Sequence, residues 1–136
     1  MYNLIKSSFL TDKLEISRNN VKLRNFKLNP TITRKTGKIK ENLYYTALTL
    51  FIKSSEEHPF PVNITVHFKG IFEFSNIDNE ENVSTFLKGE AVQIMFPYLR
   101  TITTNLSVAA MMPPIILPII DTTKLFNTST DSVLIN

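Results

Sequence analysis

A proline-broken apolar segment near the C-terminal end limits how this chain can fold. Val108 to Ile120 carries Pro113, Pro114 and Pro118 among isoleucine, leucine and methionine residues. Proline lacks a backbone donor and clashes inside a helix, so the segment can neither extend the helical pattern before it nor pair as an ordinary strand. It is also too short to span a bilayer. The segment must therefore lie against an apolar surface of its own fold, of a sister subunit or of an unfolded client.

The composition is typical of one packed domain, which we expect to span residues 1–136. A chain of 136 residues buries roughly two thirds of its unfolded surface. Ten phenylalanines against three glycines favour a filled core. Without cysteine there is no thiolate nucleophile or thiolate metal site, and two histidines alone do not make a zinc site. We expect no metal, no cofactor and, without a phosphate loop or nucleophile elbow, no enzymatic activity.

Charge and the N-terminal sequence exclude other classes of protein. Met1–Ile16 has no continuous apolar stretch of signal-peptide length, so we expect a cytoplasmic protein without membrane insertion. The formal net charge is +3, and the one basic cluster, Arg34–Lys40, surrounds Gly37. Such a cluster is typical of a solvated hairpin tip, and we expect no nucleic-acid partner.

Period-two patterns predict two main strands. Asn42 to Lys53 is apolar on both alternating faces, which is typical of a central strand covered on both sides. Val62 to Phe74 alternates apolar and polar residues, which predicts a long strand with one dry face. Gly70 interrupts this strand and suggests a bulge or a bend.

Two further strands are expected earlier in the chain. Asn25 to Arg34 contains Pro30, which favours an edge strand, and a turn at Arg34 to Lys38 would join it to the central strand as an antiparallel hairpin. Leu10, Leu14 and Ile16 predict a strand in the N-terminal region.

Helical spacing begins after Asn76. The acidic residues Asp78, Glu80 and Glu81 favour the first turn of a short helix that ends at Gly89. Apolar residues then recur at helical spacing from Glu90 to Ala110, with a kink or a helix start at Pro97. Strands followed by helices predict an α+β fold, with helix on one face of the sheet.

Three motifs, taken in order, resemble the SecB family of export chaperones. They are KGIFEFSNI at Lys69 to Ile77, IMFPYLRTITTNL at Ile94 to Leu106, and PPIILPIIDTTKLF at Pro113 to Phe126. The resemblance implies a four-stranded antiparallel sheet with a long helix packed on one face, assembled as a dimer or a dimer of dimers. It also implies a holdase that binds unfolded or nascent polypeptides in apolar grooves, for export or for a dedicated partner such as an antitoxin.

The same resemblance implies two sets of site residues. The client contacts would be two strand aromatics and the apolar residues of the proline-rich segment: Phe72, Phe74, Met112, Ile115, Ile116, Leu117 and Ile119. The helix motif would supply oligomer-interface or structural residues: Tyr98, Arg100, Ile102 and Leu106. The residues also admit a second interpretation, in which the segment only seals its own sheet.

Two regions depart from the family pattern. Typical members dock the basic tail of the secretion ATPase on an acidic sheet face, whereas Lys13, Ser17 and Thr65 stand near those positions here. We therefore expect poor docking to that ATPase. After Phe126 the tail consists largely of weak helix formers, so the family's second helix should be short or absent. An alternative function is a non-chaperone scaffold of SecB-like fold that uses the apolar segment for oligomerisation.

Overall fold

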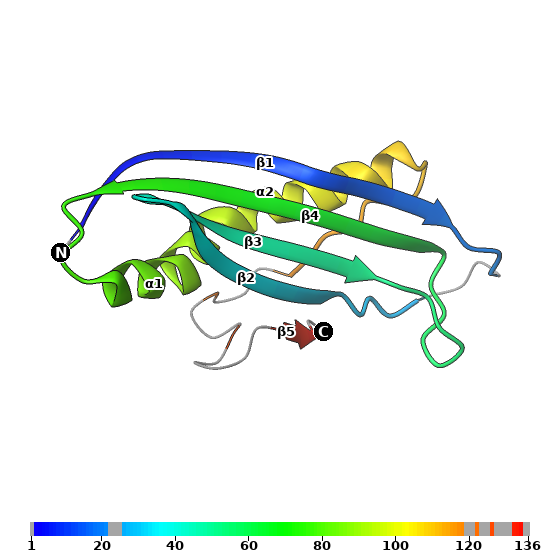
Figure 1. Cartoon of the computed structure of the whole chain (residues 1–136). Coiled ribbons are helices and arrows are strands. Elements are labelled where there is room, and N and C mark those ends of the chain that lie inside the picture. Colours follow the sequence, from blue (N-terminus) through cyan, green and yellow to red (C-terminus); the bar gives the residue numbers. More distant parts are fainter. Residues whose placement is uncertain (1, 22–25, 119–121, 123–125, 127–131, 135–136) are drawn as a thin grey trace.

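The fold is an antiparallel sheet with helices on one face (Figure 1). A computed structural model of the chain describes residues 2–21, 26–118, 122, 126 and 132–134. In chain order the elements are β1 (Asn3–Arg18), β2 (Thr31–Lys40), β3 (Leu43–Ile52), β4 (Val62–Ser75), α1 (Glu80–Lys88), α2 (Glu90–Ala109) and β5 (Ser132–Leu134). The strand order is β1-β4-β3-β2-β5, and all neighbours are antiparallel. The predicted α+β fold, with four main strands and a long helix on one face, is confirmed.

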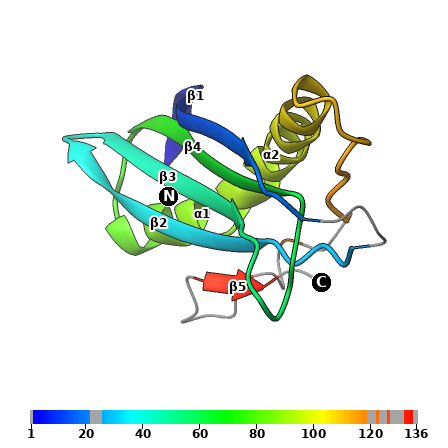
Figure 2. The same ribbon diagram turned by 90° about the vertical axis from the view of Figure 1, so that its right-hand side faces the viewer.

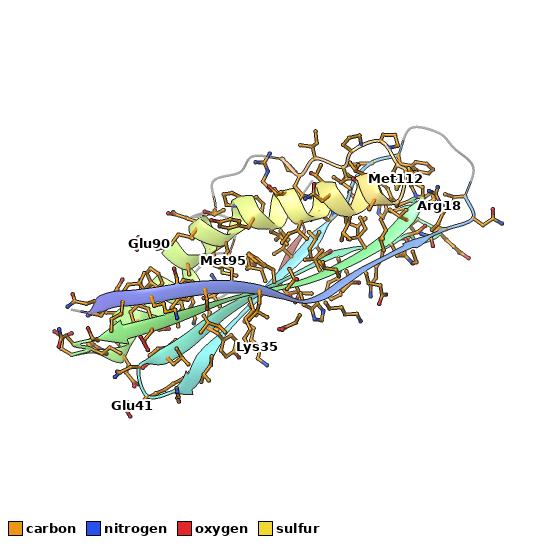
Figure 3. All side chains as sticks on the ribbon, turned by 90° about the horizontal axis from the view of Figure 1, so that it is seen from above. Arg18, Lys35, Glu41, Glu90, Met95 and Met112 are labelled. Carbon is orange, nitrogen blue, oxygen red and sulfur yellow. The ribbon has the colours of Figure 1, made fainter. Side chains whose placement is uncertain are left out.

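The sheet has an inner face toward the helices and an outer face on the other side (Figures 2 and 3). Side chains of β3 and β4 alternate between buried and half-buried along their whole length, because successive residues of a strand point to opposite faces. β3 lies at the centre of the strand order, as its apolar pattern predicts.

The β2–β3 hairpin forms as expected, but its turn does not lie at Arg34 to Lys38. The chain reverses at Glu41 and Asn42, and Asn42 adopts a φ of 64°, the left-handed conformation that tight hairpins need and that asparagine tolerates. Gly37 lies within β2 opposite Tyr45, where an added Cβ would stand 2.7 Å from the tyrosine ring. β2 thus starts and ends later than predicted. β5 pairs with its first three residues, Thr31–Thr33, and the rest of β2 forms the edge of the sheet, as predicted.

Gly70 also has a packing role. Both neighbouring strands pair with β4 in regular register through this residue, so the predicted bulge is absent there. The irregularities lie instead in β1, which inserts Ile5 and Asp12. A Cβ at residue 70 would stand 2.9 Å from the sulfur of Met95, so the glycine lets α2 approach the sheet.

The helices begin and end where the sequence indicates. The Asn79 side chain accepts the Glu81 N–H at 2.9 Å and caps α1, which ends at Gly89. α2 follows at once and continues through Pro97, so this proline starts no new helix. Among the described residues none after Ala109 is helical, and β5 pairs with β2 instead, in agreement with a second helix that is short or absent.

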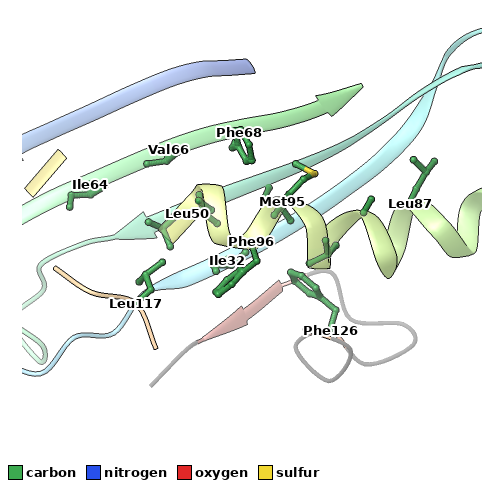
Figure 4. Packing of buried hydrophobic residues seen from close by; sticks show 14 of the residues in the cluster. Ile32, Leu50, Ile64, Val66, Phe68, Leu87, Met95, Phe96, Leu117 and Phe126 are labelled. Carbon is green, nitrogen blue, oxygen red and sulfur yellow. The ribbon is translucent and has the colours of Figure 1, made fainter. Parts of the chain in front are cut away.

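Two polar side chains tie the last turn of α1 to the inner face. Thr46, fully buried on β3, donates its hydroxyl to the Leu87 carbonyl at 2.7 Å. Arg34 donates to the Lys88 carbonyl at 2.7 Å and is itself buried, so it does not belong to a solvated hairpin tip. These bonds satisfy helix-end carbonyls that have no partner within the helix. Around them the core fills the space between sheet and helices (Figure 4).

The Thr46 hydrogen bond gives a test of how the helix is held. Replacing Thr46 with Val keeps the shape but leaves the Leu87 carbonyl without this donor, so Thr46→Val should lower the free energy of unfolding by about 1–2 kcal/mol. The matched control is Thr49→Val, on the outer face of the same strand. It should change the stability by less than about 0.5 kcal/mol. Urea unfolding of both variants measures the difference, and equal effects would contradict the assigned role of Thr46.

Candidate functional site

The proline-rich segment turns back after α2 and runs along it. Met111 has a φ of 61°, which reverses the chain just past the helix end. The Met112 N–H then donates to the Ser107 carbonyl at 3.1 Å. From there the segment lies antiparallel to the last turns of α2, because its later residues bond to earlier helix residues.

Three polar side chains of α2 hold the backbone of this segment. Ser107 accepts the Ile115 N–H at 2.8 Å, and Thr104 donates to the Ile115 carbonyl at 2.7 Å. Arg100 donates from Nε to the Leu117 carbonyl at 3.1 Å. The spacing of these residues, i, i+4 and i+7, places them on one face of the helix. The helix thus supplies the partners that a proline-broken segment cannot find in a sheet.

Sequence reasoning missed Thr104 and Ser107 in this role. The signal that could have found them is their spacing from Arg100, which places all three side chains on one face of the helix. Sequence reasoning also missed a contact between β1 and the end of α2. Arg18, the last residue of β1, donates a hydrogen bond to the carbonyl of Ala110, the C-cap residue of α2. Figure 3 shows Arg18 and Met112 at this end of the sheet.

The apolar side chains of the segment divide between core and surface. Ile115 and Leu117 are buried and belong to the core. Ile116, between them, is 66% exposed, and Met111 is 89% exposed. Met112 is half-buried against the core. The segment therefore seals its own fold with one side and presents apolar side chains with the other.

The two aromatic residues expected to contact clients lie elsewhere. Phe72 and Phe74 are 0% exposed on the inner face. Their rings pack edge-on against Phe86 of α1, at centroid distances of 5.3 and 5.5 Å. The structure thus separates them from Met112 and Ile116 by the packed core, and Ile119 lies outside the described residues.

The remaining predicted residues lie along α2. Arg100 has the structural contact given above, while Ile102 and Leu106 are partly buried against the core. Tyr98 is 53% exposed, and its ring lies 5.3 Å from that of Phe9 on β1. Val108, also half exposed, adds an apolar side chain next to Met111 that sequence reasoning did not select.

A surface hollow lies away from the segment, where α1 meets α2. It is lined by polar and apolar side chains of α1, of α2 and of Tyr2, which precedes β1: Tyr2, Asn82, Thr85, Phe86, Glu90 and Gln93. None of the residues predicted from the sequence lines it.

Three titratable side chains, Lys38, Tyr44 and Glu80, interact where the β2–β3 hairpin meets α1. Glu80 accepts a hydrogen bond from Lys38 at 3.2 Å, which raises the pKa of Lys38. Burial raises the pKa of Tyr44, whose hydroxyl also bonds to Glu80. These contacts join the β2–β3 hairpin to α1. Within the described ranges no three histidine or carboxylate side chains gather as metal ligands, and no helix is long and apolar enough to cross a membrane.

Comparison with known proteins agrees with this geometry. The family model of the preprotein translocase subunit SecB matches residues 15–132. No curated protein matches the sequence at a significant level. A solved structure of the Mycobacterium tuberculosis SecB-like chaperone Rv1957, in complex with a ChAD peptide from the Rv1956 HigA1 antitoxin, has the same fold, with a TM-score of 0.73. The alignment covers 88% of this chain and 90% of that chain at 10% identity.

The family match spans most of the chain, and the solved structure shares its sheet and its long helix. Both agree with the three ordered motifs in the sequence. The chain belongs to the SecB family.

Proposed function

We propose that this protein is a holdase that binds unfolded or aggregation-prone polypeptides on the apolar surface at the end of α2. We define this client surface by four residues that are exposed or half-buried there: Val108, Met111, Met112 and Ile116. The observation that carries the proposal is an exposed isoleucine between two buried neighbours, on a backbone fixed by hydrogen bonds to α2.

Two properties of the client surface suit binding without sequence specificity. Its backbone is held in place before a client arrives, so little conformational entropy is lost on binding. Its methionines are flexible and polarisable, which lets one surface fit many apolar side chains.

In this proposal the buried residues among the predicted client contacts belong to the core and do not touch the client. Direct contact of Phe72, Phe74 or Leu117 with a client would require α2 or the segment to leave the sheet and expose the core. Ile116 and Met112 need no such rearrangement, so we assign the client contacts to them and to their exposed neighbours.

The family and its solved relative support a polypeptide as the proposed client. The Mycobacterium tuberculosis chaperone is bound to an antitoxin peptide, which supports a polypeptide client, for export or as a dedicated partner.

Docking to the secretion ATPase concerns another surface. Lys13, Ser17 and Thr65 all lie on the outer sheet face, because each pairs with outer-face residues of the neighbouring strand. A cationic tail should bind this face weakly, so docking to the secretion ATPase should be poor.

We further propose that the protein assembles with copies of itself. β1 is a 16-residue edge strand, paired on one side with β4. It exposes Leu4, Ile5, Leu10 and Leu14. A long edge strand with apolar side chains favours pairing with another strand. The alternative function is a non-chaperone scaffold that uses the apolar segment for oligomerisation, for which exposed Ile116 and Met111 would serve as contacts between copies.

The first prediction concerns holdase activity. Stoichiometric amounts of the protein should suppress the aggregation of a chemically unfolded model protein, measured by light scattering during dilution from denaturant. Suppression should require free client surface, so an excess of a short apolar peptide should reverse it. An unchanged aggregation curve would contradict general holdase activity.

The second prediction separates the client surface from other exposed apolar residues. Ile116→Ser should weaken binding of an unfolded polypeptide about fivefold, because an exposed apolar contact is lost. The matched control is Ile39→Ser, at an exposed isoleucine beside the β2–β3 turn, at the other end of the molecule (Figure 3). The control should bind as the parent does, as measured by fluorescence anisotropy of a labelled client.

Analytical ultracentrifugation of the same two variants decides between holdase and scaffold. If Ile116→Ser dissociates the assembly and leaves client binding unchanged, the scaffold function is favoured. If it weakens client binding with the assembly intact, the holdase is supported.

A further inference from the structure

The outer face of the sheet is basic and carries no helix of the described chain. Cross-strand register places lysines on it from β1, β2 and β4, and Lys53 follows the end of β3, with few carboxylates among them. The lysines are Lys6, Lys13, Lys35, Lys40, Lys53 and Lys69. The carboxylates that the register places on this face are Glu15 and Glu73, and Asp12 stands at an irregularity of β1. Figure 3 shows Lys35 on the side of the sheet away from α2.

Two of these lysines are held over aromatic rings. The Lys69 ammonium lies 4.7 Å from the centre of the Tyr45 ring, and that of Lys53 lies 4.8 Å from the centre of the Phe51 ring. Such contacts contribute about 0.5–1 kcal/mol at exposed sites and leave the N–H donors available to solvent. The cations are therefore positioned over the sheet before any partner binds.

Among the residues that the structure describes, most of these lysines have no ion-pair partner. Lys13 pairs with Glu15 at 3.5 Å on the same strand. Lys35, Lys53 and Lys69 form no ion pair with any residue that the structure describes. Lys35 and Lys69 stand on either side of Ala47 in one cross-strand row.

We propose that the outer face docks an acidic, extended segment of a partner polypeptide. Lys35 and Lys69 are separated by two strand spacings, about 10 Å. Lys53 directly follows the last residue of β3, about 20 Å from that row at the rise of an extended strand. Carboxylates on alternate residues of an extended peptide, about 7 Å apart, reach ammonium groups over this span.

The aromatic residues favour a peptide over a nucleic acid. Single strands bind sheets by stacking bases on free ring faces. The Tyr45 ring lies so close to Gly37 that a Cβ there would come within 2.7 Å of it, and the Lys69 ammonium lies over the same ring. Lys53 lies over Phe51 in the same way. The surface thus offers ammonium groups for carboxylates and leaves little ring surface for bases.

The docking site is separate from the client surface, because the two lie on opposite sides of the sheet. One molecule would therefore bind an acidic partner and an unfolded client at the same time. This inference does not depend on the holdase proposal, since it concerns other residues.

The test uses the full chain and a labelled peptide of about eight alternating glutamate and serine residues, the length that spans the lysines. Lys35→Gln/Lys69→Gln should weaken its binding about fivefold, and added salt should weaken binding to the parent chain. The matched control is Lys27→Gln/Lys88→Gln, which removes the same charge from two exposed positions outside the strands, one before β2 and one on α1. Lys35→Arg/Lys69→Arg keeps the charge and should retain binding.

Competing ligands at the same ionic strength complete the experiment. The glutamine counterpart of the peptide, oligo-dT and phosphatidylserine vesicles should each bind more weakly than the acidic peptide. Equal loss in the face variant and its control would overturn the proposal, as would stronger binding of oligo-dT or of the vesicles. Thermal unfolding followed by circular dichroism should show that all variants are folded. If Lys35→Gln/Lys69→Gln alone is unfolded, Lys35→Arg/Lys69→Arg decides. Failure of this arginine variant to bind the acidic peptide would contradict the proposal.

Discussion

Hydrogen bonds from α2 to the segment that follows it are the constraint on which the rest of this structure depends. Three prolines deprive the segment of the donors that a strand or helix would use. Arg100, Thr104 and Ser107 supply the missing partners, and Ser107 is itself fully buried. Because the backbone is satisfied in an extended form, neighbouring side chains point to opposite sides. Ile115 and Leu117 complete the core, and Ile116 is left in solvent.

The same separation of two sides recurs in the sheet. The inner face is apolar and holds α1 and α2 through the core and through the hydroxyl of Thr46. The outer face carries lysines positioned over Tyr45 and Phe51. The protein therefore has an apolar surface at the end of α2 and a charged surface across the sheet. Their physical chemistry differs, so one molecule has room for an apolar client and an acidic partner.

Much of the fold could be predicted from the sequence, because periodicity reports burial directly. The alternation of β4 and the helical spacing of α2 both match the structure. The hairpin turn was misplaced because Gly37 was interpreted as a turn residue, whereas the Tyr45 ring requires a glycine there. Asn42, the residue that adopts the left-handed conformation, was overlooked.

The site was predictable only in part. The prolines indicated an apolar segment that could not bury every side chain, and Ile116 confirms this. Which side chains turn outward depends on contacts of Thr104 and Ser107 that no local pattern reports. Phe72 and Phe74 share a parity with the core of β4, and the sequence alone does not tell how far the helices extend over them.

The most direct measurement of the central claim is methyl NMR of the isoleucine side chains during titration with an unfolded polypeptide. The account predicts that the Ile116 methyl signal shifts or broadens first, while those of exposed Ile39 and buried Ile32 stay unchanged. An unaffected Ile116 signal, with client-induced changes confined to Ile39 or to residues of the outer sheet face, would contradict it.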